Sequence, residues 1–92
     1  MISRQLDLFE REQEDVISEC EELERAYNAA PRDEAEERYG DYVDAVETGT
    51  ELLADMRDHY ARSLDEPDGY LREFNKAVER RLPPFALEIE NR

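Results

Sequence analysis

A helical repeat runs through residues 35–63, which read AEERYGDYVDAVETGTELLADMRDHYARS. Apolar or small side chains return there at alternating steps of four and three residues, a spacing that places them on one stripe of a helix. The stripe consists of Ala35, Tyr39, Tyr42, Val46, Gly49, Leu53, Met56, Tyr60 and Ser63. The pattern therefore predicts a long helix over about residues 32–65, with one face turned toward a core.

The same spacing precedes this stretch and predicts another long helix over about residues 3–29. Its stripe consists of Ile2, Leu6, Phe9, Gln13, Val16, Cys20, Leu23, Tyr27 and Ala30. Ser3 is a candidate N-cap, and Pro31 ends the helix because the residue before a proline disfavours the helical region. So short a connection predicts antiparallel neighbours, a helical hairpin. Pairing the stripes outward from the turn places Cys20 beside Val46, Val16 beside Gly49, Phe9 beside Met56 and Leu6 beside Tyr60.

Gly49 is the weak point of the second helix, since an interior glycine costs about 1 kcal/mol relative to alanine. Thr48 and Glu51 form a capping-box pair, which would fit a break in the helix. An inserted turn would shift the repeat, however, and the repeat continues through Gly49 without a slip. We therefore predict a continuous helix in which Gly49 leaves room for Val16 or Ile17 from the facing helix.

A shorter helix is expected over about residues 68–82, followed by a different kind of segment. Asp65-Glu66-Pro67-Asp68-Gly69 has the composition of a turn, and Pro83-Pro84 ends the helix that follows it. Residues 85–90 then alternate apolar and polar side chains, which is the periodicity of a strand. An extended tail over residues 83–92 is the prediction, lying over the helices or pairing with its copy in a second subunit.

A two-helix hairpin has one buried seam and an open side that needs cover. The third helix and the tail can supply that cover, and so can the hairpin of a second copy. We predict a single all-α domain over residues 1–92, a helical coiled-coil-like bundle that forms a dimer.

The charge balance constrains solvent and partners. The chain carries 26 acidic and 12 basic residues, a net charge of −14, and Lys76 is its only lysine. Like charges oppose the compact state at low salt, and about 1 M salt shortens the screening length to about 3 Å. In composition the chain resembles small acidic proteins of salt-loving archaea; codon bias in a high-GC bacterium is the alternative explanation for the excess of arginine. Binding to nucleic-acid phosphates needs an extended basic surface, and Arg80-Arg81 is the only local cluster of basic residues, so we expect no nucleic-acid partner. An acidic rod that mimics DNA is the alternative.

The sequence also bears on compartment. No apolar run approaches the roughly 18 residues of a membrane span, and the N-terminal residues open into a charged pattern with no signal-peptide core. Cys20 is the only cysteine, so an intrachain disulfide is excluded. We expect a cytoplasmic protein without a membrane partner.

Two acidic segments suggest an enzyme as an alternative. Glu19-Cys20-Glu21-Glu22-Leu23 and residues 36–42, EERYGDY, resemble the paired acidic helices of MazG-type nucleotide pyrophosphohydrolases. The resemblance implies an all-helical, dimeric hydrolase in which Glu19, Glu22, Asp41 and Asp44 hold Mg²⁺, a hard cation that prefers oxygen ligands. On the predicted helices, however, Glu22, Asp41 and Asp44 point away from the apolar stripes.

The favoured hypothesis is therefore a protein-interaction or scaffold module adapted to a high-salt cytoplasm, with no catalytic residue and no cofactor. Apolar residues left uncovered by charge are its candidate contacts. They lie on the tyrosine-rich part of the second helix and on the tail: Tyr39, Tyr42, Phe85, Leu87 and Ile89.

Overall fold

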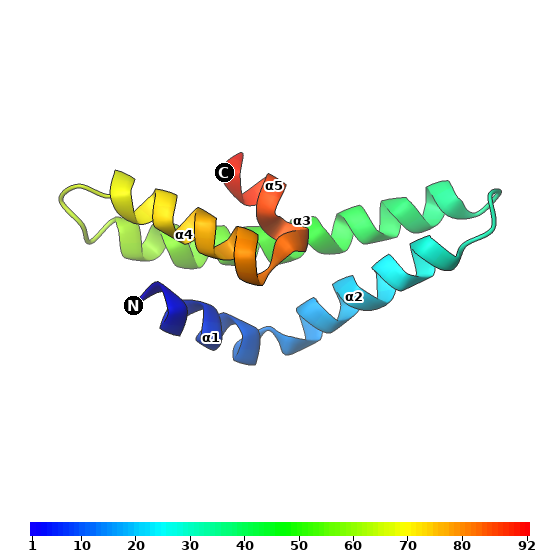
Figure 1. Ribbon diagram of the computed structural model, residues 1–92, viewed down its shortest axis with the longest axis horizontal. Helices are drawn as coiled ribbons and strands as arrows, with labels where there is room; N and C mark the ends of the chain where they lie inside the picture. The colour runs from blue at the N-terminus through cyan, green and yellow to red at the C-terminus, as the bar shows by residue number, and fades with distance from the viewer.

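The computed structural model describes residues 1–92 as helices joined by short loops, without a strand. The elements are α1 (Ile2–Glu12), α2 (Glu14–Ala29), α3 (Ala35–Ala61), α4 (Asp68–Arg81), the 3-10 turn η1 (Pro83–Phe85) and α5 (Ala86–Glu90). The all-α class is confirmed. The molecule is a rod with principal extents of 51 × 24 × 18 Å, and Figure 1 shows α3 along its length.

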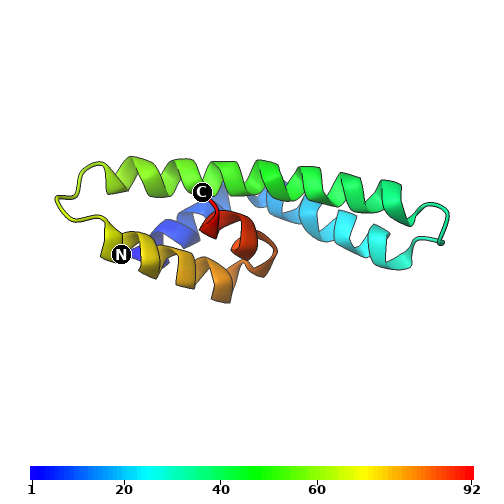
Figure 2. The same ribbon diagram turned by 90° about the horizontal axis from the view of Figure 1, so that it is seen from above.

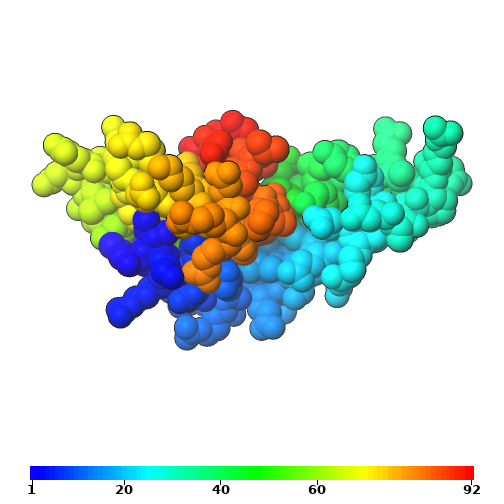
Figure 3. Space-filling model, viewed as in Figure 1, coloured from blue at the N-terminus to red at the C-terminus, as the bar shows by residue number.

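α3 is the spine on which the other elements pack. α2 lies along its N-terminal half, while α4 returns beside its C-terminal half and α5 sits near mid-length, on the same side of α3 as α4 (Figure 2). Toward one end of the rod the α2–α3 pair carries no further helix and tapers in Figure 3. We call residues 14–47 the arm; it comprises α2, the loop that follows and the first part of α3, and its outer end extends beyond the other helices.

The predicted helix over residues 3–29 is two helices, because the chain bends at Gln13. Gln13 has φ −113° and ψ 31°, although its N–H still donates to the Phe9 carbonyl over 2.8 Å. The bend turns α1 away from the line of α2 (Figure 1). Phe9 consequently reaches the core, where its ring meets Phe85 edge-on at a centroid distance of 6.4 Å.

The principal helical partner of α1 is α4 and not α3, so the predicted seam does not extend through Leu6 and Phe9 to α3. Polar contacts hold α1 in this place. Arg81 donates to Asp7 Oδ1 over 2.6 Å, to Glu10 Oε2 over 3.0 Å and to the Ser3 carbonyl over 3.0 Å. Ser3 is thus a partner of Arg81, and no side-chain hydrogen bond caps α1.

α3 runs through Gly49 without a break, as the uninterrupted repeat predicts. The side chain that needs the space is not Val16 or Ile17, however. A Cβ at Gly49 would stand 2.5 Å from Cε1 and 2.7 Å from Cζ of Phe85. The glycine therefore admits an aromatic ring from the C-terminal segment, a contact between residues far apart in sequence.

The predicted extended tail is wrong, since residues 83–90 form η1 and α5. Phe85 and Ile89 are buried and Leu87 is exposed. That arrangement suits a helix because residues four apart share a face, and it also suits the alternation expected of a strand. A helix satisfies its own backbone hydrogen bonds, whereas a lone strand leaves them unpaired; helix is therefore the outcome here.

A buried arginine fixes α5 in place. Arg57, on α3, is 3% exposed and donates from Nη1 to the Ile89 carbonyl over 3.0 Å and to Asn75 Oδ1 over 3.1 Å. Its Nε donates to Asp58 Oδ1 over 2.9 Å. A cation suits the carbonyl end of a helix. Arg57 therefore joins α3, α4 and α5, a role that the sequence analysis did not anticipate.

Candidate functional site

An apolar groove of about 290 Å³ lies where the arm meets the C-terminal segment. One wall comes from α3 and the other from η1 and α5. Its lining residues are Tyr39, Tyr42, Val43, Val46, Glu47, Pro83, Pro84, Leu87 and Glu88. We call it the Tyr39–Leu87 groove.

Local sequence explains how the two walls come together. Pro83 and Pro84 cannot continue α4, because proline lacks the N–H that a helix interior needs. The chain reverses through η1, and the buried Phe85 and Ile89 hold α5 against the core. Leu87 lies on the opposite side of α5 and is left facing out.

Two large side chains of the groove are open to solvent. Leu87 is 79% exposed, the highest fraction of any large hydrophobic residue in the chain, and Tyr39 is 50% exposed. Glu47 and Glu88 supply carboxylates to the same lining. The groove therefore offers an apolar floor with acidic groups at its edge.

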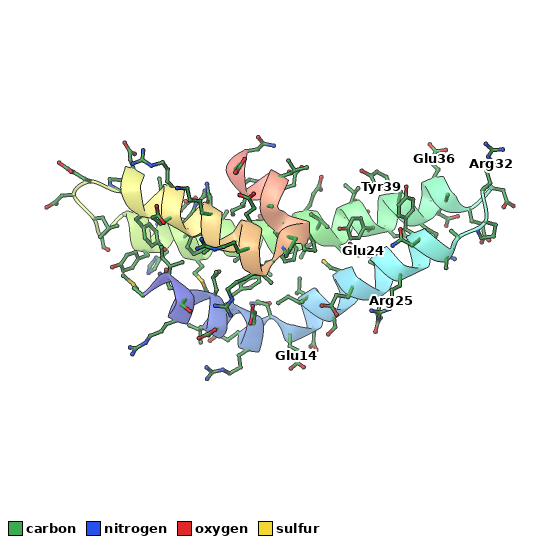
Figure 4. The ribbon with its side chains drawn as sticks, in the orientation of Figure 1. Glu14, Glu24, Arg25, Arg32, Glu36 and Tyr39 are labelled. Carbon is green, nitrogen blue, oxygen red and sulfur yellow. The ribbon has the colours of Figure 1, made fainter.

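The tyrosines of the groove are tied to α2. Tyr42 donates its hydroxyl to Glu24 Oε2 over 3.1 Å, and the rings of Tyr27 and Tyr39 lie 5.2 Å apart. Burial, together with the hydrogen bond to the Glu24 carboxylate, raises the pKa of Tyr42 to about 12. Figure 4 labels Glu24 and Tyr39 in the arm. These contacts hold the α3 wall of the groove against α2.

The raised pKa of Tyr42 predicts a loss of stability at alkaline pH. An unfolded tyrosine titrates near pH 10, so between about pH 10 and pH 12 the unfolded chain releases this proton while the folded chain retains it. Stability from this group is complete below pH 10 and is lost as the pH rises through 12. Denaturant titrations should show a smaller alkaline loss in Tyr42→Phe. An equal loss in both proteins would contradict the assignment.

The structure brings together three of the five predicted contact residues. Tyr39, Tyr42 and Leu87 line one groove. Phe85 and Ile89 were wrong as contact residues, because they are 1% and 0% exposed and belong to the core. Val43 also lines the groove; its position beside the main stripe of α3 was the sequence signal that could have identified it.

The acidic residues of the enzyme alternative do not form a metal centre. No three His, Cys, Asp or Glu side chains converge in a way that could hold an ion. Glu19, Glu22 and Asp44 are exposed, and Asp41 is paired with Arg38 at 3.6 Å. Cys20 is buried, and that burial raises the pKa of its thiol, the reverse of what a nucleophile needs.

Fold and groove together define an all-helical protein with an open apolar groove on its surface. Comparisons with protein-family models, with curated proteins and with solved structures find no match to this chain. The compositional likeness to proteins of salt-loving archaea and the likeness to MazG-type enzymes therefore stay predictions. None of the helices combines the length and apolar character that a membrane crossing requires.

Proposed function

We propose that this protein is a non-enzymatic interaction or scaffold module of a high-salt cytoplasm, and that the Tyr39–Leu87 groove is its contact surface. The observation that carries the proposal is Leu87, which is 79% exposed beside an apolar groove. Charged residues make up 41% of the chain, so an open leucine next to open tyrosine is unlike the rest of the surface. Aromatic side chains are enriched at the centres of protein interfaces.

The MazG-like alternative receives no support from the site. That chemistry needs several carboxylates facing one ion, and here the four candidates are divided between solvent and an ion pair with Arg38. Nothing in the groove replaces them, because Glu47 and Glu88 are its only carboxylates. A protein that mimics nucleic acid would bind its partner through its acidic surface, and the groove would have no part in that contact.

The test is a bait experiment in an extract of the source cells, at the salt concentration of those cells. Tagged wild-type protein is compared with Leu87→Glu, which places a charge in the groove, and with Leu8→Glu. Leu8 is a matched control because it is an exposed leucine, 42% accessible, on α1 outside the groove. The proposal expects a protein retained by wild type and by Leu8→Glu but lost with Leu87→Glu. Equal retention by all three baits, or magnesium-dependent hydrolysis of nucleoside triphosphates that Glu22→Gln abolishes, would overturn it.

Adaptation to salt predicts a melting temperature that rises from about 0.1 M to about 1 M KCl, as the screening length falls from about 10 Å to about 3 Å. Repulsion within a chain of net charge −14 is the reason. For a domain of this size, each kcal/mol of relief raises the melting temperature by roughly 4–8 °C. A variant with four exposed arm carboxylates neutralised, Glu22, Asp33, Glu34 and Glu37 changed to their amides, should show a smaller rise. A flat salt response in the wild type would contradict the prediction.

A further inference from the structure

Charge is distributed unevenly along the rod. The arm, residues 14–47, holds thirteen acidic and three basic side chains, a net charge of −10. α4 holds four basic and three acidic side chains, so it is the one long helix with a net positive charge. Figure 1 places α4 and the arm toward opposite ends of the rod, with α5 between them.

The exposed face of α4 concentrates its positive charge. Arg72, Lys76 and Arg80 follow one another at steps of four residues, which aligns them on one side of the helix, and all three are exposed. Lys76 lies 3.7 Å from Glu73, whereas Arg72 and Arg80 form no ion pair. We call these three residues the basic stripe. In a chain so rich in acidic residues, a row of exposed basic side chains offers a surface to which carboxylates can bind.

The central part of the rod carries an exposed leucine and a groove on one face. Leu87 projects from α5 and is 79% exposed, and the apolar groove opens beside it. A two-fold pair of identical subunits needs one patch that contacts its own copy, so that a projection and a recess on the same face satisfy each other twice. Leu87 is such a projection, and the Tyr39–Leu87 groove is such a recess.

These observations lead to one occupant for the groove, which deepens the proposed function and rests on it. We propose that a second copy of this chain docks antiparallel on this face, around a two-fold axis near α5. Leu87 of each copy enters the partner's groove, and the basic stripe of each copy lies against the acidic arm of the other. Reversing the direction of one rod brings its acidic arm over the basic stripe on α4 of its neighbour.

Sedimentation of the purified chain, at about 0.15 M and about 1 M KCl, tests the dimer. Wild type is expected at twice the monomer mass of 10.9 kDa. Leu87→Glu should raise the dimer dissociation constant at least about a hundredfold. Each subunit buries one Leu87 in the interface, so the substitution removes two buried leucines from every dimer. Leu8→Glu should leave it unchanged. A monomeric wild type at both salts, an assembly larger than two, or a dimer indifferent to Leu87→Glu would overturn the inference.

A pair of charge reversals tests the antiparallel arrangement. One variant carries Arg72→Glu, Lys76→Glu and Arg80→Glu. The other carries Glu36→Arg and Glu37→Arg, two exposed positions on the arm outside the groove; Figure 4 labels Glu36 near the arm's tip. Each variant alone should lose dimer at about 0.15 M KCl, since the reversed stripe of the first variant repels the acidic arm, and the two added positive charges of the second oppose the basic stripe in both contacts. Mixing the two variants should restore a heterodimer, because one contact is then the native pair and the other sets the reversed stripe against the two added positive charges.

The outcomes separate this inference from the proposed function. If the mixture stays monomeric, the antiparallel charge contact is wrong. If the bait experiment retains another protein through Leu87 while the purified chain is monomeric, the contact surface stands and the second copy is excluded. Helix content from circular dichroism shows whether each variant folds. For a variant that does not, the corresponding Gln substitutions, which remove charge without reversing it, should raise the dissociation constant in the same direction.

Discussion

Replacing Phe85 with alanine is expected to lower the free energy of unfolding by about 3–5 kcal/mol, the usual cost of removing a buried phenylalanine. Phe85 is 1% exposed, meets Phe9 edge-on and lies over the backbone of Gly49. A chain of this length has about 5–14 kcal/mol of stability in total. Urea unfolding followed by circular dichroism measures the loss, and a cost under about 1 kcal/mol would contradict the packing described here.

Substitution of Gly49 checks the same contact from the other side. In an ordinary helix glycine to alanine stabilises by about 1 kcal/mol, but a Cβ here would stand 2.5 Å from Phe85 Cε1. Gly49→Ala should therefore cost about 1–3 kcal/mol, as overpacking does. In the Phe85→Ala background the same change should stabilise, because the ring is gone.

Gly40→Ala is the matched control for this cycle. Gly40 lies on the same helix, and a Cβ there would meet no heavy atom within 4 Å. It should stabilise the protein by roughly 0.5–1 kcal/mol. If Gly49→Ala and Gly40→Ala have the same effect on stability, the close approach of Phe85 to α3 is wrong.

Arg57→Met is expected to lower the free energy of unfolding by about 2–4 kcal/mol. Methionine keeps the apolar stem but leaves the Ile89 carbonyl and Asn75 Oδ1 without their donor, and each buried unpaired polar group costs about 1–3 kcal/mol. Arg57→Lys should recover only part of the loss, because an ammonium lacks the planar fork of the guanidinium.

Two measurements distinguish the loss of the Arg57 hydrogen bonds from a general loss of positive charge. Arg62→Ala, an exposed arginine one turn further along, should change stability by no more than about 0.5 kcal/mol. Amide hydrogen exchange in Arg57→Met should increase first in α5, whose carbonyl end the arginine holds. Protection of α5 equal to that in wild type would show that the guanidinium does not hold this helix.

The helices that could be predicted are those whose ends are set by residues close to them in the sequence. α4 was expected over about residues 68–82 and spans Asp68–Arg81, since Pro67 and Pro83 limit it on both sides. α3 was expected over about residues 32–65 and spans Ala35–Ala61, because its ends unwind into turns. Its continuity through Gly49 also followed from the repeat.

The two wrong predictions, the extended tail and the unbroken first helix, concern segments whose structure depends on more than the local pattern. Residues 85–90 fit both a strand and a helix. Apolar residues at positions 85, 87 and 89 follow the alternation of a strand, and positions 85 and 89, four residues apart, share one face of a helix. Six residues are too few for periodicity to separate the two. The bend at Gln13 was missed because the repeat continues through it, while α4 offers α1 partners, Arg81 among them, that no local pattern reveals.

By itself, the sequence determined an acidic chain of the all-α class, the continuity of α3 through Gly49, the position of α4 between its prolines and the tyrosines on α3. Periodicity and proline act over a few residues, so these features can be read directly. Only the tertiary structure decided that Leu87 stands beside Tyr39 and Tyr42, that Phe85 fills the space at Gly49 and that Arg57 holds α5. Each of those contacts joins segments more than 30 residues apart, and packing, not local preference, selects them.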